Sequence, residues 1–313
     1  MYNRRQFIKN IGVGAGALAL LSKTQQGLAQ EVGTIRVGYQ SCDPLDLFRN
    51  SEIIKKFPGK VSWSQFVAGP PLVQALLAGS IDVGEVGDTP PIFAQSASKN
   101  IVYIAQEPPS PDSEAIIVHQ ASNIQDLAGL KGKKIAVTRG SNANWLLLAA
   151  LKKVGLSLKD VQPVFLPPAI AQSAFNTGRV DAWAIWDPFL AIAQADNTVR
   201  TLTTGKGIVA NRTYYIANKD FVKNNPQLVK GFVSSLAEND QLITQDKTKF
   251  IKYLQSASGL SPQILTVILD RCNFGATLVQ PDAIAEQQKI ADSFFEQHLI
   301  PAKINVQDSI WKG

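Results

Sequence analysis

Short apolar segments alternate with amphipathic ones along most of the chain. In the first of them, at 34–39, Ile35, Val37 and Tyr39 occupy every second position, which is typical of a half-buried strand. The next segment spaces its apolar residues as a helix does, and the pair of patterns recurs. Strands are predicted at 34–39, 61–66, 81–84, 101–105, 115–118, 134–138, 161–166, 180–184, 199–203 and 213–217. Strands that alternate with helices at this spacing predict an α/β protein with mostly parallel sheets.

Two polar segments interrupt the alternation. Residues 107–111 hold three prolines, and residues 205–212 are polar and contain glycine, so both predict connections between domains. A short helix is predicted at 124–130, and everything after Lys219 has helical periodicity. Because the last strand could return to the first sheet, we expect a leader at 1–30, lobe I at 31–109 and 214–313, and lobe II at 110–213.

The first 30 residues have the features of an export signal. Arg4 and Arg5 precede an apolar run at 11–21 and a small-residue end at 27–29, which is the order found in a twin-arginine signal. The apolar run is shorter than the ~20 residues that a membrane span needs. An ordinary N-terminal helix is the alternative. We therefore expect a soluble protein that is exported to the periplasm without a lipid anchor.

Charge and composition exclude several classes of function. The formal charge of +6 falls to +2 without the leader, whose four charged residues are all basic, so no nucleic-acid-binding surface is expected. His119 and His298 are the only histidines, and the chain has no Ser/His/Asp order and no Walker-type phosphate loop. Cys42 is the one candidate nucleophile, and nothing near it in sequence would lower its pKa. We expect no catalytic residue, metal or cofactor.

The turn within GEVGDTPPIFAQ, at 84–95, carries the first candidate for ligand binding. Gly87 lets the backbone turn tightly and approach a ligand. Thr89 is a candidate N-cap, and Pro90 suits the first helical position because its missing N–H would be unpaired there. A helix N-terminus favours an anion, with the N–H groups of Gly87, Asp88, Thr89 and Ile92 as donors. A strand–turn–helix junction without a ligand is the alternative.

A second helix start follows the strand at 134–138. Gly140 permits close approach, Ser141 can cap the helix, and Asn142 keeps its N–H group. Arg139 could add a charge-assisted donor. An ordinary capped surface helix is the alternative. Two such helix starts in separate lobes suggest a ligand clamped between them.

Other candidate ligand contacts follow from the ends of the strands. Ligands of parallel α/β sheets lie beyond the carboxyl ends of the strands, where the loops at 40–43, 68–70 and 87–91 should converge. That position makes Gln40, Ser41, Cys42 and Gly69 candidates. Trp183 and Trp186 lie three apart at a strand end, and one of them is expected to face a cleft as an aromatic wall for an apolar tail. Asp187 is a candidate helix cap or ligand contact, and Tyr214 is a further cleft candidate.

The chain resembles the periplasmic substrate-binding proteins of ABC-type sulfonate importers, and most of all those that bind aliphatic sulfonates. The residues that carry the resemblance are RVGYQ at 36–40, AGP at 68–70, GSIDVG at 79–84, GDTPPIFAQ at 87–95 and VDAWAIWDP at 180–188. The resemblance covers essentially the whole chain after the leader. It implies the type II periplasmic-binding-protein fold, with two α/β lobes, a hinge and a C-terminal helical wrap.

The resemblance also implies a function and a site. Such a protein, a monomer, would deliver an alkanesulfonate to an ABC transporter permease in the inner membrane. The turn at 87–89 and residues 139–142 would flank the sulfonate, and Trp183, Trp186 and Tyr214 would face its tail. The sequence departs from the family at 40–43, where Asp43 adds an acidic residue. LPPAI at 166–170 is more similar to taurine-binding relatives, so taurine is an alternative ligand. A binding protein for nitrate or for a thiamine precursor is a second alternative. An enzyme of the pyrimidine synthase type is a third.

Overall fold

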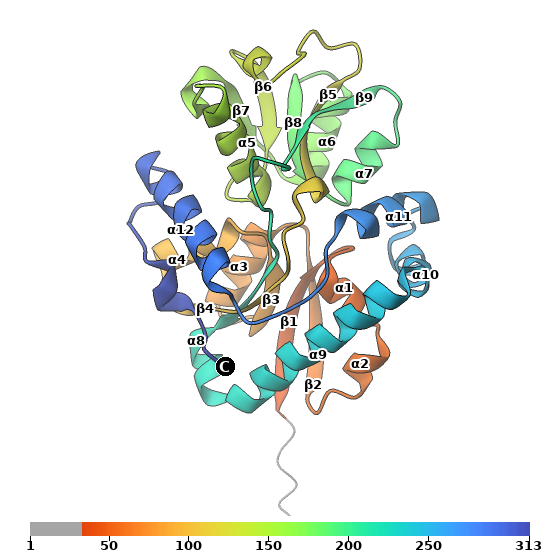
Figure 1. Ribbon diagram of the computed structural model, residues 1–313, viewed down its shortest axis with the longest axis vertical. Coiled ribbons are helices and arrows are strands. Elements are labelled where there is room, and N and C mark those ends of the chain that lie inside the picture. The colour runs from red at the N-terminus through yellow and green to blue at the C-terminus, as the bar shows by residue number, and fades with distance from the viewer. Residues whose placement is uncertain (1–32) are drawn as a thin grey trace, which may run out of the picture. The chain divides into compact units, whose positions relative to one another are not determined.

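The first sheet combines the start of the chain with one strand that returns much later. The computed structural model describes residues 33–313 and holds two five-stranded sheets (Figure 1). The first has the order β2-β1-β3-β10-β4. Its strands are β1 (Thr34–Gln40), β2 (Lys60–Phe66), β3 (Val83–Val86), β4 (Ile101–Gln106) and β10 (Tyr214–Asn218). β1 is parallel to β2 and β3, whereas β10 lies antiparallel between β3 and β4, so the predicted return strand is confirmed.

The second sheet is continuous in sequence and has the order β7-β6-β8-β5-β9. Its strands are β5 (Glu114–His119), β6 (Lys134–Val137), β7 (Gln162–Phe165), β8 (Ala182–Trp186) and β9 (Val199–Thr204). β6 is parallel to β7 and β8, and β5 is antiparallel to β8 and β9. We call the two sheets with their helices lobe I and lobe II. The exact residue bounds of the lobes stay a prediction, and the predicted leader lies outside the described residues.

Two strands begin two residues later than predicted, for the same physical reason in each lobe. Just before β3, the carboxylate of Asp82 accepts a hydrogen bond from the backbone N–H of Arg36 at 2.8 Å. Just before β8, the carboxylate of Asp181 accepts one from the N–H of Lys134 at 2.7 Å. Each aspartate takes a donor that the strand ladder would otherwise use. Regular pairing therefore starts at the following residue.

The helices cover both sheets. Lobe I carries α1 (Pro44–Phe48), α2 (Glu52–Lys55), α3 (Gly69–Leu77) and α4 (Pro90–Ala97), and lobe II carries α5 (Asn142–Lys153), α6 (Pro168–Asn176) and α7 (Phe189–Gln194). The helix predicted at 124–130 is wrong, because only a 3-10 turn forms at Ala128–Leu130. The side chains of Ser122 and Asp126 accept hydrogen bonds from the N–H groups of Ile124 and Gly129, which favours a turn over a helix.

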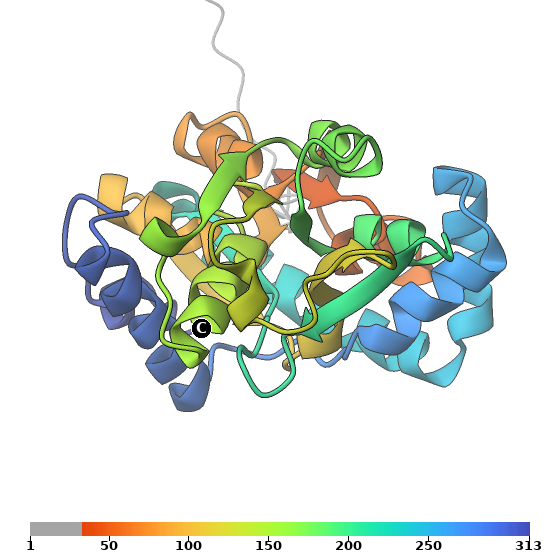
Figure 2. The ribbon, with the colours of Figure 1, turned by 90° about the horizontal axis from the view of Figure 1, so that it is seen from above.

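The C-terminal helices wrap around lobe I. They are α8 (Lys219–Asn224), α9 (Pro226–Gln245), α10 (Lys247–Ser258), α11 (Pro262–Arg271) and α12 (Pro281–Glu296). Figures 1 and 2 show α12 on one side of the molecule and the α10–α11 pair on the other. Between residues 33 and 313 no helix is both long and apolar enough to cross a membrane.

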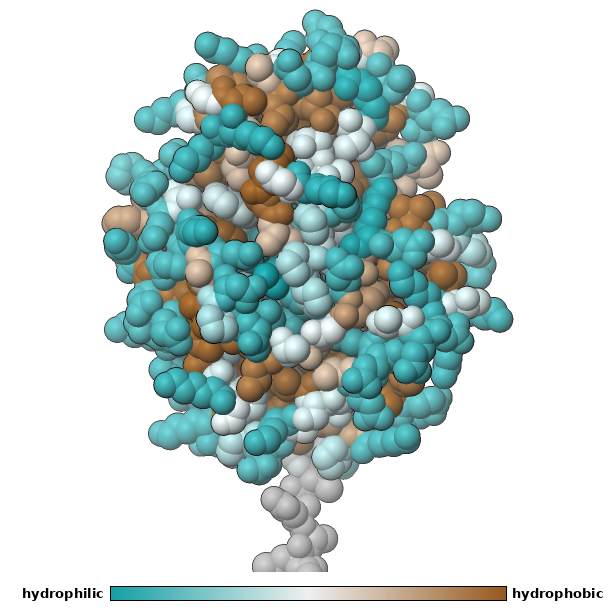
Figure 3. Space-filling model, in the orientation of Figure 1, coloured by the Kyte–Doolittle hydropathy of each residue, from teal (hydrophilic) through white to brown (hydrophobic). Residues whose placement is uncertain are grey.

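Apolar residues on both faces of β10 explain why it can lie inside the first sheet. Tyr215 and Ala217 pack into the core on one face, and Tyr214 and Ile216 into the core on the other. A strand covered on both faces is apolar at successive positions, as this one is. Lobe II has a core of its own. On the face drawn in Figure 3, hydrophilic side chains surround small, separated hydrophobic patches.

Candidate functional site

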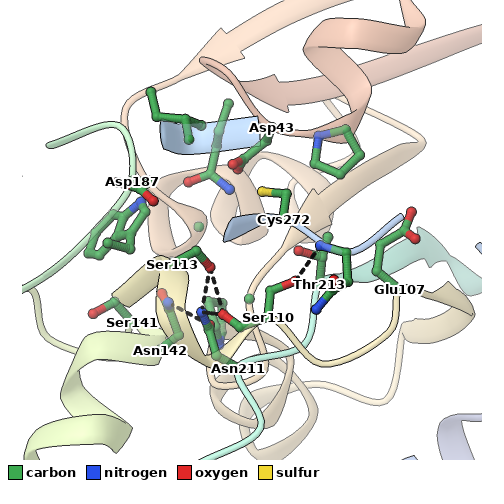
Figure 4. Close-up of a pocket in the computed structure, with 18 residues that line it drawn as sticks. Asp43, Glu107, Ser110, Ser113, Ser141, Asn142, Asp187, Asn211, Thr213 and Cys272 are labelled. Atoms are coloured by element: carbon green, nitrogen blue, oxygen red, sulfur yellow. Dashed lines mark hydrogen bonds between the residues drawn. The ribbon is translucent and has the colours of Figure 1, made fainter. Parts of the chain in front are cut away.

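A cavity of about 50 Å³, here called the central cavity, lies where the two lobes meet the segments that connect them (Figure 4). The two connecting segments run together, with the N–H of Glu107 donating to the carbonyl of Thr213 at 2.8 Å. Lobe I contributes Gln40, Asp43, Pro44, Gly69, Gly87 and Pro90 to the lining, and lobe II contributes Ser141, Asn142, Trp186 and Asp187. The rest comes from the connections, through Glu107, Ser110, Ser113, Asn211 and Thr213, and from the end of α11, through Ile268, Cys272 and Asn273.

The wall from lobe I is built by three loops that follow parallel strands. Residues from the loops after β1, β2 and β3 all line the central cavity, so the predicted convergence of these loops is confirmed. Gly87 lies so close to lobe II that a Cβ atom added there would be 3.0 Å from Cβ of Asn142. A side chain at Gly69 would meet Pro90 at 2.7 Å. Both positions therefore require glycine because neighbouring residues pack too closely for a side chain, not because of an unusual backbone conformation.

The wall from lobe II is the N-terminus of α5. Ser141 caps this helix as predicted, with its Oγ accepting a hydrogen bond from the N–H of Asn144 at 3.3 Å. Gly140 precedes it with a φ of 72°, a backbone conformation that favours glycine. Within the described part of the chain, the N–H groups of Asn142 and Ala143 have no hydrogen-bond partner. Asn142 lines the central cavity and Ala143 is buried directly behind it, so this helix N-terminus places an unpaired N–H at the cavity wall.

A polar network ties the connecting segments to α5. The side-chain amide of Asn142 donates to Glu114 at 2.8 Å and to Oδ1 of Asn211 at 3.0 Å. The amide of Asn211 in turn donates to the carbonyl of Ser110 at 2.9 Å and to Oγ of Ser113 at 3.0 Å, as the dashed lines in Figure 4 show. These contacts fix the orientation of Asn142.

The acidic end of the central cavity carries perturbed carboxyl groups. Burial, with Asp46 and Asp187 nearby, raises the pKa of Asp43 to about 8. Burial also raises the pKa of Asp187 to about 6, opposed by Arg271, whose guanidinium lies 3.2 Å from its carboxylate. Burial and Asp240 raise the pKa of Glu107 well above its usual range. No Lys or Arg is among the described residues that line this cavity.

A second space of about 360 Å³, here called the outer cleft, opens beside Trp186. It shares Gln40 and Trp186 with the central cavity and is also lined by Ser41, Gln65, Phe66, Val67, Pro188 and Phe189. The indole of Trp186 packs edge to face with Phe189, with ring centroids 6.2 Å apart. Trp186 therefore stands between a small polar cavity and a larger, mostly apolar cleft.

Several of the predicted site residues lie elsewhere. Trp183 is fully buried in the core of lobe II against Phe175, because positions three apart on a strand face opposite ways. Arg139 is exposed, and its guanidinium lies 4.1 Å from the ring centroid of Phe165 rather than at the cavity. Tyr214 is buried, with its hydroxyl donating to the carbonyl of Ala283 at 3.3 Å.

The first predicted helix start is also different from expectation. Thr89 occupies the N-cap position of α4 but makes no capping hydrogen bond, because its backbone is helical rather than extended and the next two residues are prolines without N–H groups. Its hydroxyl donates to the carboxylate of Asp88 at 2.9 Å. Both residues are buried and neither lines the central cavity. Cys42 is buried as well, among apolar residues of α1, α10 and α11, and Ser41 lines only the outer cleft.

Asp187 keeps its predicted capping bond in a shifted position. Pro188 is the N-cap of α7, and the carboxylate of Asp187 accepts a hydrogen bond from the N–H of Ala191 at 2.9 Å.

The sequence did not predict the lining residues from the connecting segments and from α11. The polar residues Ser110, Ser113 and Asn211 were visible only as parts of predicted linkers. The helical pattern of α11 carries no sign that its end reaches a cavity.

Comparisons with known proteins agree with this architecture. The model of the NMT1/THI5-like family matches residues 68–247. The putative aliphatic sulfonates-binding protein of Escherichia coli K12 is 37% identical over 301 residues, which cover 94% of each chain. The crystal structure of the periplasmic aliphatic sulphonate binding protein SsuA from Escherichia coli is similar with a TM-score of 0.82 at 37% identity, covering 89% of this chain and 97% of that one. The alkanesulfonate-binding protein SsuA from Xanthomonas axonopodis pv. citri, bound to MOPS, reaches 0.87 at 36% identity, covering 91% and 100%.

Two α/β lobes joined by paired connections, with a cavity between them, define a substrate-binding protein of the periplasmic type. The expected type II periplasmic-binding-protein fold is confirmed by the similarity to these solved structures. The chain belongs to the NMT1/THI5-like family and, within it, to the group of aliphatic-sulfonate-binding proteins of ABC importers.

Proposed function

We propose that this protein captures alkanesulfonates in the central cavity and presents them to the permease of an ABC transporter in the inner membrane. The observation that carries the proposal is the free N-terminus of α5 at the cavity wall, opposite the close turn at Gly87. A sulfonate stays singly negative at every physiological pH, so it needs hydrogen-bond donors and no proton acceptor. The N–H groups of Asn142 and Ala143 and the dipole of α5 suit that charge.

Such a set of hydrogen bonds is strong enough for the affinity that a binding protein needs. Hydrogen bonds to a charged group contribute roughly 1.5–3 kcal/mol each, so three or four would reach about micromolar affinity after the costs of association. The donors besides those of α5 would come from the polar side chains on the same side of the cavity. The hydroxyl of Thr213 is the candidate among them, because the hydroxyls of Ser113 and Ser141 already donate to the carbonyls of Ser110 and Thr138, each at 2.7 Å. In this proposal Gln40, Gly69, Gly87, Ser141, Asn142, Trp186 and Asp187 remain ligand-binding residues, and Gly140 supports the turn.

The tail of the ligand would pass Trp186 into the outer cleft. Phe66, Val67 and Phe189 line that cleft, and Val67 keeps 69% of its surface exposed. An exposed apolar side chain beside a cleft is suited to cover an alkyl chain. A short sulfonate would fit within the central cavity, and a longer one would extend along the indole of Trp186.

The cellular role follows from the same proposal. As a member of a group of binding proteins of ABC importers, the protein would act with a membrane permease, and the predicted twin-arginine leader would export the folded chain to the periplasm. We propose a monomer, because the ligand cavity is complete within one chain.

A catalytic role has little support from the described side chains. Burial raises the pKa of the Cys42 thiol to about 12 and that of Cys272 well above its usual range, which disfavours the nucleophilic thiolate. The ring of His119 stacks on Phe175 with centroids 4.2 Å apart, away from the central cavity. We therefore propose a binding protein rather than an enzyme.

Calorimetric titration of the protein without its leader, in a buffer free of sulfonates, tests the proposal. The ligands are ethanesulfonate, hexanesulfonate, taurine, sulfate and nitrate. Sulfonates should bind at about micromolar affinity and the two inorganic anions far more weakly. Preferential binding of nitrate would favour the nitrate-binding alternative. Absence of heat for all the sulfonates would overturn the proposal.

A further inference from the structure

The charges around the central cavity do not match a ligand that is only an anion. Asp43, Glu107 and Asp187 line it, and no lining residue in the described range is basic. An anion would be repelled by any of these carboxylates that stays ionised. The state of each one therefore decides what the cavity prefers.

Two of the three carboxyl groups already have partners. Asp187 pairs with Arg271 at 3.2 Å and accepts the N–H of Ala191. Glu107 accepts hydrogen bonds from the hydroxyl of Tyr215 and, at 2.9 Å, from the N–H of Gly275. The side chain of Asp43 makes no hydrogen bond and no ion pair with any residue in 33–313.

The reason why Asp43 is free lies in the start of α1. Asp43 occupies the N-cap position, where an aspartate usually accepts a backbone N–H of the first turn, yet it makes no such bond. Glu85 does so instead, because its carboxylate accepts the N–H of Leu45 at 2.6 Å and that of Gln40 at 3.2 Å. Glu85 of β3 thus accepts the N–H that an N-cap aspartate usually accepts, and the carboxylate of Asp43 remains at the cavity.

The free carboxylate lies away from the donors. Figure 4 shows Asp43 at one end of the cavity and Ser141 with Asn142 at the other. A cavity of about 50 Å³ has room for roughly three to five water molecules, and so for a ligand of only a few carbons. One end thus suits a negative group and the other a positive group, a short distance apart.

We propose that the preferred ligand is a short aminoalkanesulfonate, a zwitterion whose ammonium group binds the carboxylate of Asp43 while its sulfonate binds at the N-terminus of α5. This inference rests on the proposed function and specifies its substrate class. Ammonium groups donate three hydrogen bonds, and a partly buried carboxylate is a strong acceptor for them.

Taurine and propanesulfonate form a matched pair for the test, because an ammonium group replaces a methyl group of the same size. The wild-type protein should bind taurine about tenfold or more tightly than propanesulfonate. Asp43→Asn should abolish most of that preference, measured as the ratio of the two affinities in the same variant. The control is Asp270→Asn on α11, which removes a carboxylate that is 60% exposed and should change neither ligand.

Proton release gives a second readout that needs no variant. Burial raises the pKa of Asp43 to about 8, so the group is largely protonated at pH 7. The groups that face it are Asp46, Glu85, Cys42 and Cys272, together with Asp187 and its partner Arg271. A bound ammonium would lower this pKa and release a proton. Titrations of taurine in two buffers of different ionisation enthalpy should show that release, and titrations of propanesulfonate should not.

The outcomes separate this inference from the proposed function. Equal affinity of the wild-type protein for taurine and propanesulfonate overturns the inference and leaves the sulfonate function standing. Unchanged taurine affinity in Asp43→Asn overturns it too, since a protonated Asp43 that donates to the sulfonate would be mimicked by asparagine. Failure of both ligands to bind overturns the proposed function itself.

Discussion

Gly87 and Asn142 bring the two lobes into contact, since a Cβ atom on Gly87 would lie 3.0 Å from both Cβ and Cγ of Asn142. Contacts tighter than about 3.4 Å require one neighbour to move. The side chain of Asn142 has little freedom to do so, because Glu114 and Asn211 hold its amide. The lobes can therefore approach this closely at the central cavity only because residue 87 is a glycine.

Gly87→Val should hold the lobes apart and weaken sulfonate binding by about tenfold or more. A ligand could then contact only one wall of the central cavity at a time. The melting temperature should change little, since the added atoms point into the space between the lobes. Calorimetric titration and thermal unfolding measure the two effects. Gly231→Ala in α9 is the control, because its nearest outside atom would be 3.8 Å away. Unchanged affinity in Gly87→Val would show that the lobes close without this contact.

Trp186→Ala should penalise long sulfonates more than short ones. The indole stands between the central cavity and the outer cleft, so only a chain that leaves the cavity needs it. Each buried CH₂ group contributes about 0.8 kcal/mol, and the loss for hexanesulfonate should exceed that for ethanesulfonate by about 1–2 kcal/mol. Titration of both ligands measures the difference. A loss independent of chain length would contradict a tail site in the outer cleft.

Arg139→Ala tests whether Arg139 contacts the ligand, as the sequence suggests, or not, as the structure indicates. The sequence alone suggests a charge-assisted donor to the ligand. In the structure the guanidinium lies over Phe165 and the residue is exposed, so sulfonate affinity should stay within about twofold. Asn142→Leu, which removes the amide at the cavity wall, is the comparison and should weaken binding. A loss of about tenfold or more in Arg139→Ala would mean that the arginine reaches the ligand.

The sequence predicted the strand pattern and the cap at Ser141, because each depends on residues close together in the chain. The return of β10 to the first sheet was also predicted, although its partners in β3 and β4 lie more than a hundred residues earlier. The sequence did not predict that Thr89 leaves the start of α4 uncapped, because the helical backbone conformation of Thr89 is set by the turn around it. Nor could it assign Asp43, whose freedom depends on Glu85, forty-two positions later in the chain, taking the first-turn N–H of α1. Competition between acceptors from distant elements is decided by tertiary structure.

We expect Glu114 to make the stability of the fold dependent on pH. It is fully buried, accepts one hydrogen bond from Asn142, and has one carboxylate oxygen without a partner in the described structure. Burial, with Asp88 nearby, raises its pKa well above the usual value. A carboxyl group whose pKa is higher in the folded than in the unfolded chain destabilises the fold progressively as pH rises above the unfolded value of about 4.3. Glu114→Gln removes this effect, so its melting temperature should exceed that of the wild type more at pH 8 than at pH 5. Glu238→Gln, on the exposed face of α9, should show no such difference, and a constant offset for Glu114→Gln at both pH values would show that this carboxyl does not titrate in the range.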